Sequence, residues 1–169
     1  MRPRVVLVGP MGAGKSTVGS LLAERWGVTV RDTDTDIEAV AGKPVSDIFV
    51  EDGEAAFRTL ERQAVAAALA THDGVLALGG GAVLDPGTRE LLHGHRVVYL
   101  RVGLADAVKR VGLGTGRPLL LGDAGGIRAR VRQLLDERAP VYEAVATEVV
   151  DTDGRSPAEV ADLIEEELT

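Results

Sequence analysis

The chain has 169 residues, of which 45% are hydrophobic and 27% are charged, so it can bury an aliphatic core within one domain, residues 1–169. It has no cysteine, which excludes disulfides, thiolate metal sites and a cysteine nucleophile. The net charge of −7 disfavours binding to nucleic acid or to an anionic membrane. The sequence has no membrane-spanning apolar stretch and no signal peptide, so we expect a cytoplasmic protein.

Short apolar strands alternate with helical segments along the chain. Strands are predicted at residues 4–8, 28–30, 74–78, 96–102 and 147–151, and helices at 17–26, 35–41, 54–71, 86–93, 104–111, 127–138 and 157–168. Continuous apolar strands are typical of a parallel sheet that is buried on both faces. The alternation predicts a three-layer α/β fold, in which ligands bind at the edge formed by the carboxyl ends of the strands.

The segment after the first strand is rich in glycine. It reads GPMGAGKS from Gly9 to Ser16 and matches the P-loop pattern G-x-x-x-x-G-K-[ST], with a strand before it and a helix after it. A simple glycine-rich turn is the alternative, but such a turn does not require this spacing. We predict an ATP site formed by Gly12, Ala13, Gly14, Lys15, Ser16 and Thr17. Lys15 would reach the β- and γ-phosphates, and Ser16 would bind Mg²⁺.

Two aspartates follow the second strand in the stretch RDTDTD, residues 31–36. P-loop proteins usually hold Mg²⁺ with an acid after a further strand, but the strand at 74–78 runs into three glycines. Asp32 and Asp34 are two residues apart, so in an extended chain both side chains point the same way. We predict that Asp32 binds Mg²⁺ and that Asp34 contacts an acceptor hydroxyl. Helix capping is the alternative for one of them, and Asp36 is expected in solvent.

Six motifs occur in one order along nearly the whole chain: the P-loop, DTD, FR in a long helix, GGG after a strand, RPLL and RAPVY. In this respect the sequence resembles the shikimate kinases. The resemblance implies the fold of nucleoside monophosphate kinases, with a five-stranded parallel sheet in the order 2-3-1-4-5. It implies a monomer that transfers the γ-phosphate of MgATP to the 3-hydroxyl of shikimate, on the pathway to chorismate and aromatic amino acids. It also implies substrate-binding helices at about 33–62 and a mobile lid at about 113–126.

The resemblance assigns the shikimate carboxylate to arginines and to the glycine loop. The residues concerned are Arg58, Arg138, Gly79, Gly80 and Gly81. Without the resemblance, Arg58 and Glu61 form an ordinary surface pair, and Arg138 complements the end of a helix. Three consecutive glycines exceed what a turn requires, and they allow the backbone to approach a ligand closely. Phe49 and Phe57 are expected in the core and also at the wall of the acceptor pocket.

The nucleotide side of the site is assigned in the same way. Arg117 lies in the glycine-rich segment and is expected to close over the phosphates as part of the lid. Arg110 resembles the family arginine that stacks on adenine, and Pro157 is a further candidate there. The alternatives are that both arginines are solvated and that Pro157 is simply the first residue of a helix.

The implied mechanism uses Asp34 as the general base, with Lys15, Mg²⁺ and Arg117 stabilising the transferring group. A kinase of another hydroxy acid such as gluconate is the alternative function. A nucleotide switch or ATPase without an acceptor leaves Arg58, Arg138 and the glycine loop unexplained. An inactive binding module is a third alternative, but every catalytic position that can be mapped is occupied. His72, His93 and His95 lack metal-ligand spacing and are expected in solvent.

Overall fold

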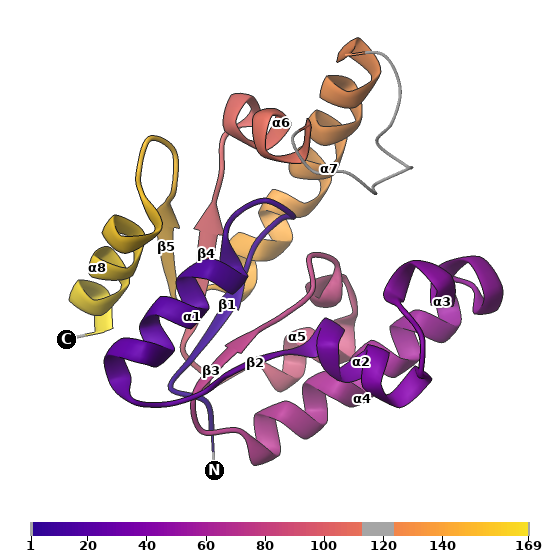
Figure 1. Ribbon diagram of the computed structural model, residues 1–169, viewed down its shortest axis with the longest axis horizontal. Coiled ribbons are helices and arrows are strands. Elements are labelled where there is room, and N and C mark those ends of the chain that lie inside the picture. The colour runs from indigo at the N-terminus through magenta and orange to yellow at the C-terminus, as the bar shows by residue number, and fades with distance from the viewer. Residues whose placement is uncertain (1, 113–123, 169) are drawn as a thin grey trace.

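A computed structural model of the protein describes residues 2–112 and 124–168. Five strands form one parallel sheet in the order β2-β3-β1-β4-β5, which confirms the implied topology (Figure 1). The strands are β1 (Val5–Val8), β2 (Val30–Asp32), β3 (Val75–Ala77), β4 (Val97–Arg101) and β5 (Glu148–Asp151). Their side chains are buried almost throughout, apart from the two edge strands, as expected for a sheet covered on both faces.

Helices cover both faces of this sheet. They are α1 (Lys15–Trp26), α2 (Thr33–Ala41), α3 (Val45–Asp52), α4 (Glu54–Thr71), α5 (Pro86–Leu91), α6 (Leu104–Gly112), α7 (Ala124–Val145) and α8 (Pro157–Leu168), with a 3-10 helix, η1 (Ala82–Leu84). Helices α1 and α8 pack on one face, and α4 and the second half of α7 pack on the other (Figure 1). None of the helices described is long and apolar enough to cross a bilayer.

The core has three parts, each made of aliphatic side chains with few aromatic rings. One lies between the sheet and α1 with α8, and includes Leu7, Leu22, Leu100 and Ile164. The second lies on the opposite face and includes Val65, Leu76, Tyr99 and Tyr142. The third joins α2, α3 and the start of α4 through Ile37, Ile48 and Phe57, in an arm beside the sheet (Figure 1).

Several helices differ from the sequence-based expectation. Helix α3 was not predicted, because it has eight residues and buries only Ile48. Helix α7 was expected to end at Arg138 but continues through Pro140 to Val145. Pro140 has no N–H to donate to the carbonyl of Asp136, and both residues are exposed. Residues 124–126 of the expected lid belong to α7, and the rest of that segment lies outside the described residues.

Two histidines and one aspartate are less exposed than expected. His72 is buried, and its Nε2 lies 3.0 Å from the carbonyl oxygen of Val75. The pKa of His95 is lowered by burial and by the charge of Arg2. Asp36 is half-buried in a 2.6 Å ion pair with Arg31. His93 is exposed, as predicted.

Candidate active site

The P-loop joins β1 to α1 at the carboxyl edge of the sheet. Gly9 must be glycine, because a Cβ there would lie 2.7 Å from the carbonyl oxygen of Leu100 on β4. Gly14 precedes the helix with a φ of 92°, a left-handed conformation that turns the chain into α1. The Lys15 ammonium donates to the carbonyl oxygens of Gly9 at 2.7 Å and Pro10 at 3.0 Å, so its side chain folds back along the loop.

Asp32 ends β2 and is also the N-cap of α2. Its Oδ1 accepts a hydrogen bond from the backbone N–H of Asp34 at 2.8 Å, and its Oδ2 lies 3.4 Å from Ser16 Oγ. The chain is therefore not extended between the two aspartates, and this part of the prediction is wrong. Asp32 can therefore cap α2 and lie beside Ser16 at the same time, because a different carboxylate oxygen makes each contact.

The P-loop, the two aspartates and the glycine loop meet around one cavity of about 300 Å³. Its lining consists of Met11, Gly12, Gly14, Lys15, Ser16, Thr17, Asp32, Asp34, Leu78, Gly79 and Gly80. The fold thus brings together segments near residues 12, 33 and 79, which the sequence alone leaves far apart.

The Asp34 carboxylate lies against the first glycine of the GGG loop. A Cβ at Gly79 would be 2.8 Å from Asp34 Oδ1 and 3.1 Å from Glu61 Oε2, so a side chain there would displace these carboxylates. Within the part of the chain that the structure describes, Oδ1 of Asp34 is buried and has no hydrogen-bond partner. Burial, followed by the charges of Asp32 and Glu61, raises the pKa of Asp34 to about 6, which suits a general base.

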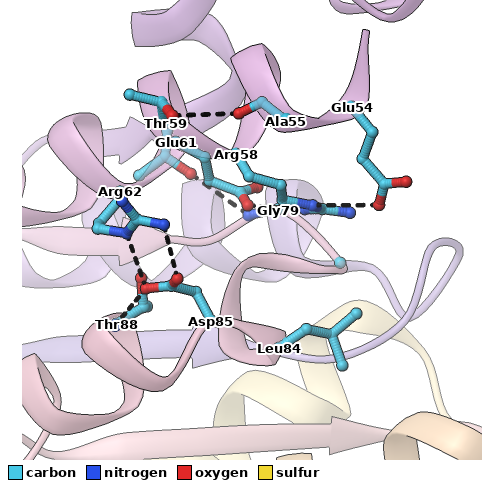
Figure 2. Close-up of polar contacts among 12 residues, drawn as sticks. Glu54, Ala55, Arg58, Thr59, Glu61, Arg62, Gly79, Leu84, Asp85 and Thr88 are labelled. Atoms are coloured by element: carbon cyan, nitrogen blue, oxygen red, sulfur yellow. Dashed lines mark hydrogen bonds and ion pairs between the residues drawn. The ribbon is translucent and has the colours of Figure 1, made fainter.

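Arg58 is not part of a surface pair. Its Nη1 donates to Oε1 of Glu61 at 2.7 Å, and the Glu61 side chain is only 3% exposed (Figure 2). Burial raises the pKa of Glu61, while the hydrogen bond and charge of Arg58 oppose the shift. The guanidinium lies against Gly81, where a Cβ would be 2.6 Å from Nη2. Arg58 is therefore held in one position beside the glycine loop.

Arg138 approaches the same loop from α7. A Cβ at Gly80 would be 3.6 Å from its Nη1. The helix runs on for seven residues beyond Arg138, so its alternative role as a helix-end cation is wrong. Tyr142, one turn further along α7, is buried and donates its hydroxyl to the carbonyl oxygen of Gly80. Burial raises the pKa of Tyr142 to about 12.

Two buried residues near the loop were missed as contributors to the site. Tyr142 follows Arg138 by four residues within the quoted motif RAPVY, and this helical spacing was the available signal. Thr33 is completely buried, and its Oγ1 accepts from the backbone N–H of Gly79 at 3.3 Å. It joins the start of α2 to the glycine loop, a contact that spans 46 residues of sequence and leaves no local pattern.

On the nucleotide side, Arg110 extends from α6 to the P-loop. Its Nη1 donates to the carbonyl oxygen of Gly12 at 2.7 Å and to Thr152 Oγ1 at 3.3 Å, so it is not a solvated arginine. Pro157 is exposed at the first position of α8. Arg117 lies outside the described residues.

The aromatic pair that was expected at the wall of the acceptor pocket is partly in the core. Phe57 is buried, Phe49 is 37% exposed, and their ring centroids are 4.6 Å apart.

A magnesium ion would have few protein ligands in this site. The described residues contain no group of three or more His, Asp or Glu side chains that could hold a metal. Ser16 and Asp32 offer a hydroxyl and a carboxylate beside the P-loop. This set fits Mg²⁺, which keeps several waters and usually takes one or two protein ligands with substrate phosphates.

Comparison with known proteins agrees with this geometry. The family model described as "Shikimate kinase" matches residues 11–169. A shikimate kinase from Thermobifida fusca is 62% identical over 167 residues, which cover 99% of this chain and 95% of the relative. The solved structure of a shikimate kinase from Acinetobacter baumannii in complex with shikimate has a TM-score of 0.91 and 35% identity, and the match covers 99% of this chain and 93% of that one.

The same fold occurs in kinases of other acids. A gluconokinase from Sinorhizobium meliloti has a TM-score of 0.57 and 21% identity over 99% of this chain and 91% of its own, a likeness of fold alone. The family model and the relatives with about 60% identity are much more specific. The chain therefore belongs to the shikimate kinase family.

Proposed function

We propose that this protein is a monomeric, magnesium-dependent shikimate kinase that converts ATP and shikimate into ADP and shikimate 3-phosphate. The observation that carries the proposal is the position of the GGG loop. Asp34 lies against Gly79, and Arg58 lies against Gly81. A ring that carries both a carboxylate and a hydroxyl can therefore meet a cation and a base at the same time.

ATP would lie in the P-loop, with its phosphates against the backbone N–H groups and Lys15. To reach them, the Lys15 ammonium exchanges its bonds to the loop carbonyls of Gly9 and Pro10 for phosphate oxygens. We assign Arg110 to the adenine side and Arg117 to the phosphates. Mg²⁺ bound by Ser16 and Asp32 would neutralise part of the phosphate charge.

Shikimate would bind through its carboxylate. Arg58 offers a planar fork of N–H donors, and Arg138 offers a second one from the other side of Gly80. Glu61 keeps the Arg58 fork in place through its 2.7 Å hydrogen bond. With the carboxylate fixed, the 3-hydroxyl lies next to Asp34 and in line with the terminal phosphate, so most of the rate enhancement comes from orientation.

Asp34 would accept the proton of the 3-hydroxyl as its oxygen attacks the γ-phosphorus. A carboxylate with a pKa of about 6 is ionised at neutral pH and is more basic than an ordinary aspartate. Phosphoryl transfer passes through a loose transition state, so the contributions of Lys15 and the arginines are electrostatic.

A coupled assay of ADP release tests this function. ADP should form rapidly only when shikimate is added, and much more slowly with gluconate or nucleoside monophosphates as acceptors. Equal ADP release without an acceptor would identify an ATPase, and preference for gluconate would identify the alternative kinase. Size-exclusion chromatography with light scattering tests the monomer.

A further inference from the structure

Two arginines on α4 point to the segment that follows β3. Arg58 lies against Gly81. Arg62, one turn further along the helix, binds Asp85 (Figure 2). Nε of Arg62 donates to Oδ2 of Asp85 at 3.0 Å, and Nη2 donates to Oδ1 at 2.9 Å. This is a bidentate ion pair, a geometry that fixes direction as well as distance.

Asp85 is also built into the backbone next to the glycine loop. Its Oδ2 accepts from the N–H of Thr88 at 2.9 Å and caps α5. Between Gly81 and Asp85 lies η1, and the Nη1 of Arg89 donates to the carbonyl oxygens of Val83 and Leu84 at 2.9 and 3.0 Å. Helix α5 and η1 are thus linked to each other, and a shift of Asp85 would be transmitted to Gly81.

The contact between the loop and Arg58 leaves little space. A Cβ at Gly81 would lie 2.6 to 3.0 Å from three atoms of the guanidinium. Apolar packing among Val65, Leu69 and Val83 also holds α4 near η1, but it is not directional. Arg62 provides a directional connection at the side of α4 that carries Arg58.

We propose that Arg62 and Asp85 are a positioning pair that sets the GGG loop against Arg58 and thereby shapes the site for the substrate carboxylate. This inference rests on the proposed function. Neither residue is assigned a contact with shikimate or ATP, so both act through the loop. Their loss should affect shikimate binding more than ATP binding or the chemical step.

The experiment compares Arg62→Ala, Asp85→Asn and the double variant with the wild type. Asparagine caps helices as well as aspartate does, so Asp85→Asn removes the charge and keeps the cap of α5. We expect the shikimate KM to rise about fivefold in each single variant and no further in the double variant. The kcat and the ATP KM should stay within about twofold of the wild type.

A matched control is Arg25→Ala. Arg25 also joins two helices through carboxylates, at 2.8 Å from Asp162 and 3.2 Å from Glu165, but it lies at the end of α1 away from the glycine loop. Its removal should leave the shikimate KM unchanged. Arg62→Lys, which keeps the charge without the fork, should give an intermediate shikimate KM, and calorimetric titration with shikimate should reproduce this order of affinities.

Two results would overturn the positioning role. One is an unchanged shikimate KM in Arg62→Ala. The other is a fall in kcat and thermal stability together with a rise in the KM values for both substrates. This is the pattern expected of a pair that only stabilises the fold. Failure of the proposed function is distinguishable, because the wild type would then show no shikimate-dependent release of ADP.

Discussion

The backbone N–H of Asp34 donates to the carboxylate of Asp32 at 2.8 Å, so one aspartate of the DTD motif fixes the start of the helix that carries the other. The second oxygen of Asp32 faces Ser16 of the P-loop. This arrangement would couple the position of the proposed general base to that of the bound phosphates, because both would depend on the same carboxylate.

Asp34→Asn should lower kcat by about 10²- to 10⁴-fold, the usual contribution of a general base. The amide has nearly the shape of the carboxylate but cannot take a proton from the acceptor hydroxyl. The affinity for ATP, measured by calorimetric titration, should remain close to that of the wild type. A kcat like that of the wild type would exclude Asp34 from the proton transfer.

The raised pKa of Asp34 should appear in both activity and stability. The kcat/KM for shikimate should fall as the pH drops below about 6, where the free enzyme protonates its base. The carboxylate of Asp34 binds a proton more tightly in the folded protein than in the unfolded chain, where the pKa of an aspartate is 3.8. The stability that this proton contributes is therefore present below pH 3.8 and is lost as the pH rises through about 6.

Asp34→Asn should for this reason stabilise the fold at pH 8 relative to the wild type, by up to about 3 kcal/mol, and much less at pH 4. Urea unfolding of both proteins at the two pH values measures the difference, and titrating groups remote from Asp34 cancel between them. The same difference at both pH values would show that the carboxyl group is not perturbed.

The elements with strong local signals could be predicted from the sequence. The P-loop has a fixed spacing, and the helices at 54–71 and 157–168 have the bounds that were expected. Ser156 caps the latter helix, since its Oγ accepts from the N–H of Glu159. In contrast, the start of α2 was placed two residues late, because the sequence offered capping as an alternative for Asp32 or Asp34 without showing which of them caps the helix.

Contacts between distant segments could not be predicted in this way. Arg62 and Asp85 are 23 residues apart, and each reads as an ordinary surface residue or helix cap in its own segment. The burial of Glu61 and of His72 also depends on what packs over them in the fold. The resemblance to a family supplied the roles expected of Arg58 and Arg138, but not the reasons for their positions.

Arg58→Ala should raise the shikimate KM strongly and leave the ATP KM unchanged, because the fork for the carboxylate is lost. It should also destabilise the protein by about 2 kcal/mol at neutral pH, since it leaves Glu61 buried without its charged partner. The two effects are separable. In Arg58→Met/Glu61→Gln, stability measured by urea unfolding should recover, whereas the shikimate KM should not; recovery of both would refute the role in binding.

Two glycine substitutions should have different kinetic effects. A methyl group at Gly79 would meet the Asp34 carboxylate at 2.8 Å, so Gly79→Ala should mainly lower kcat. At Gly81 it would meet the Arg58 guanidinium at 2.6 Å, so Gly81→Ala should mainly raise the shikimate KM. Both contacts are with the ends of side chains, and neither glycine has a positive φ, so thermal unfolding should change little. Identical kinetic defects in the two variants would contradict this assignment.

Arg110→Ala should raise the KM for ATP by about five- to tenfold while the shikimate KM stays constant. The guanidinium of Arg110 donates to the carbonyl oxygen of Gly12 at 2.7 Å, which keeps this oxygen turned towards α6. The orientation of the peptide matters because a P-loop binds phosphate through its backbone N–H groups. Lys109→Ala is the matched control, since Lys109 is an exposed cation on the same helix. If both variants weakened ATP binding equally, the effect would come from the net charge of α6, and the specific contact between Arg110 and the P-loop would have no role.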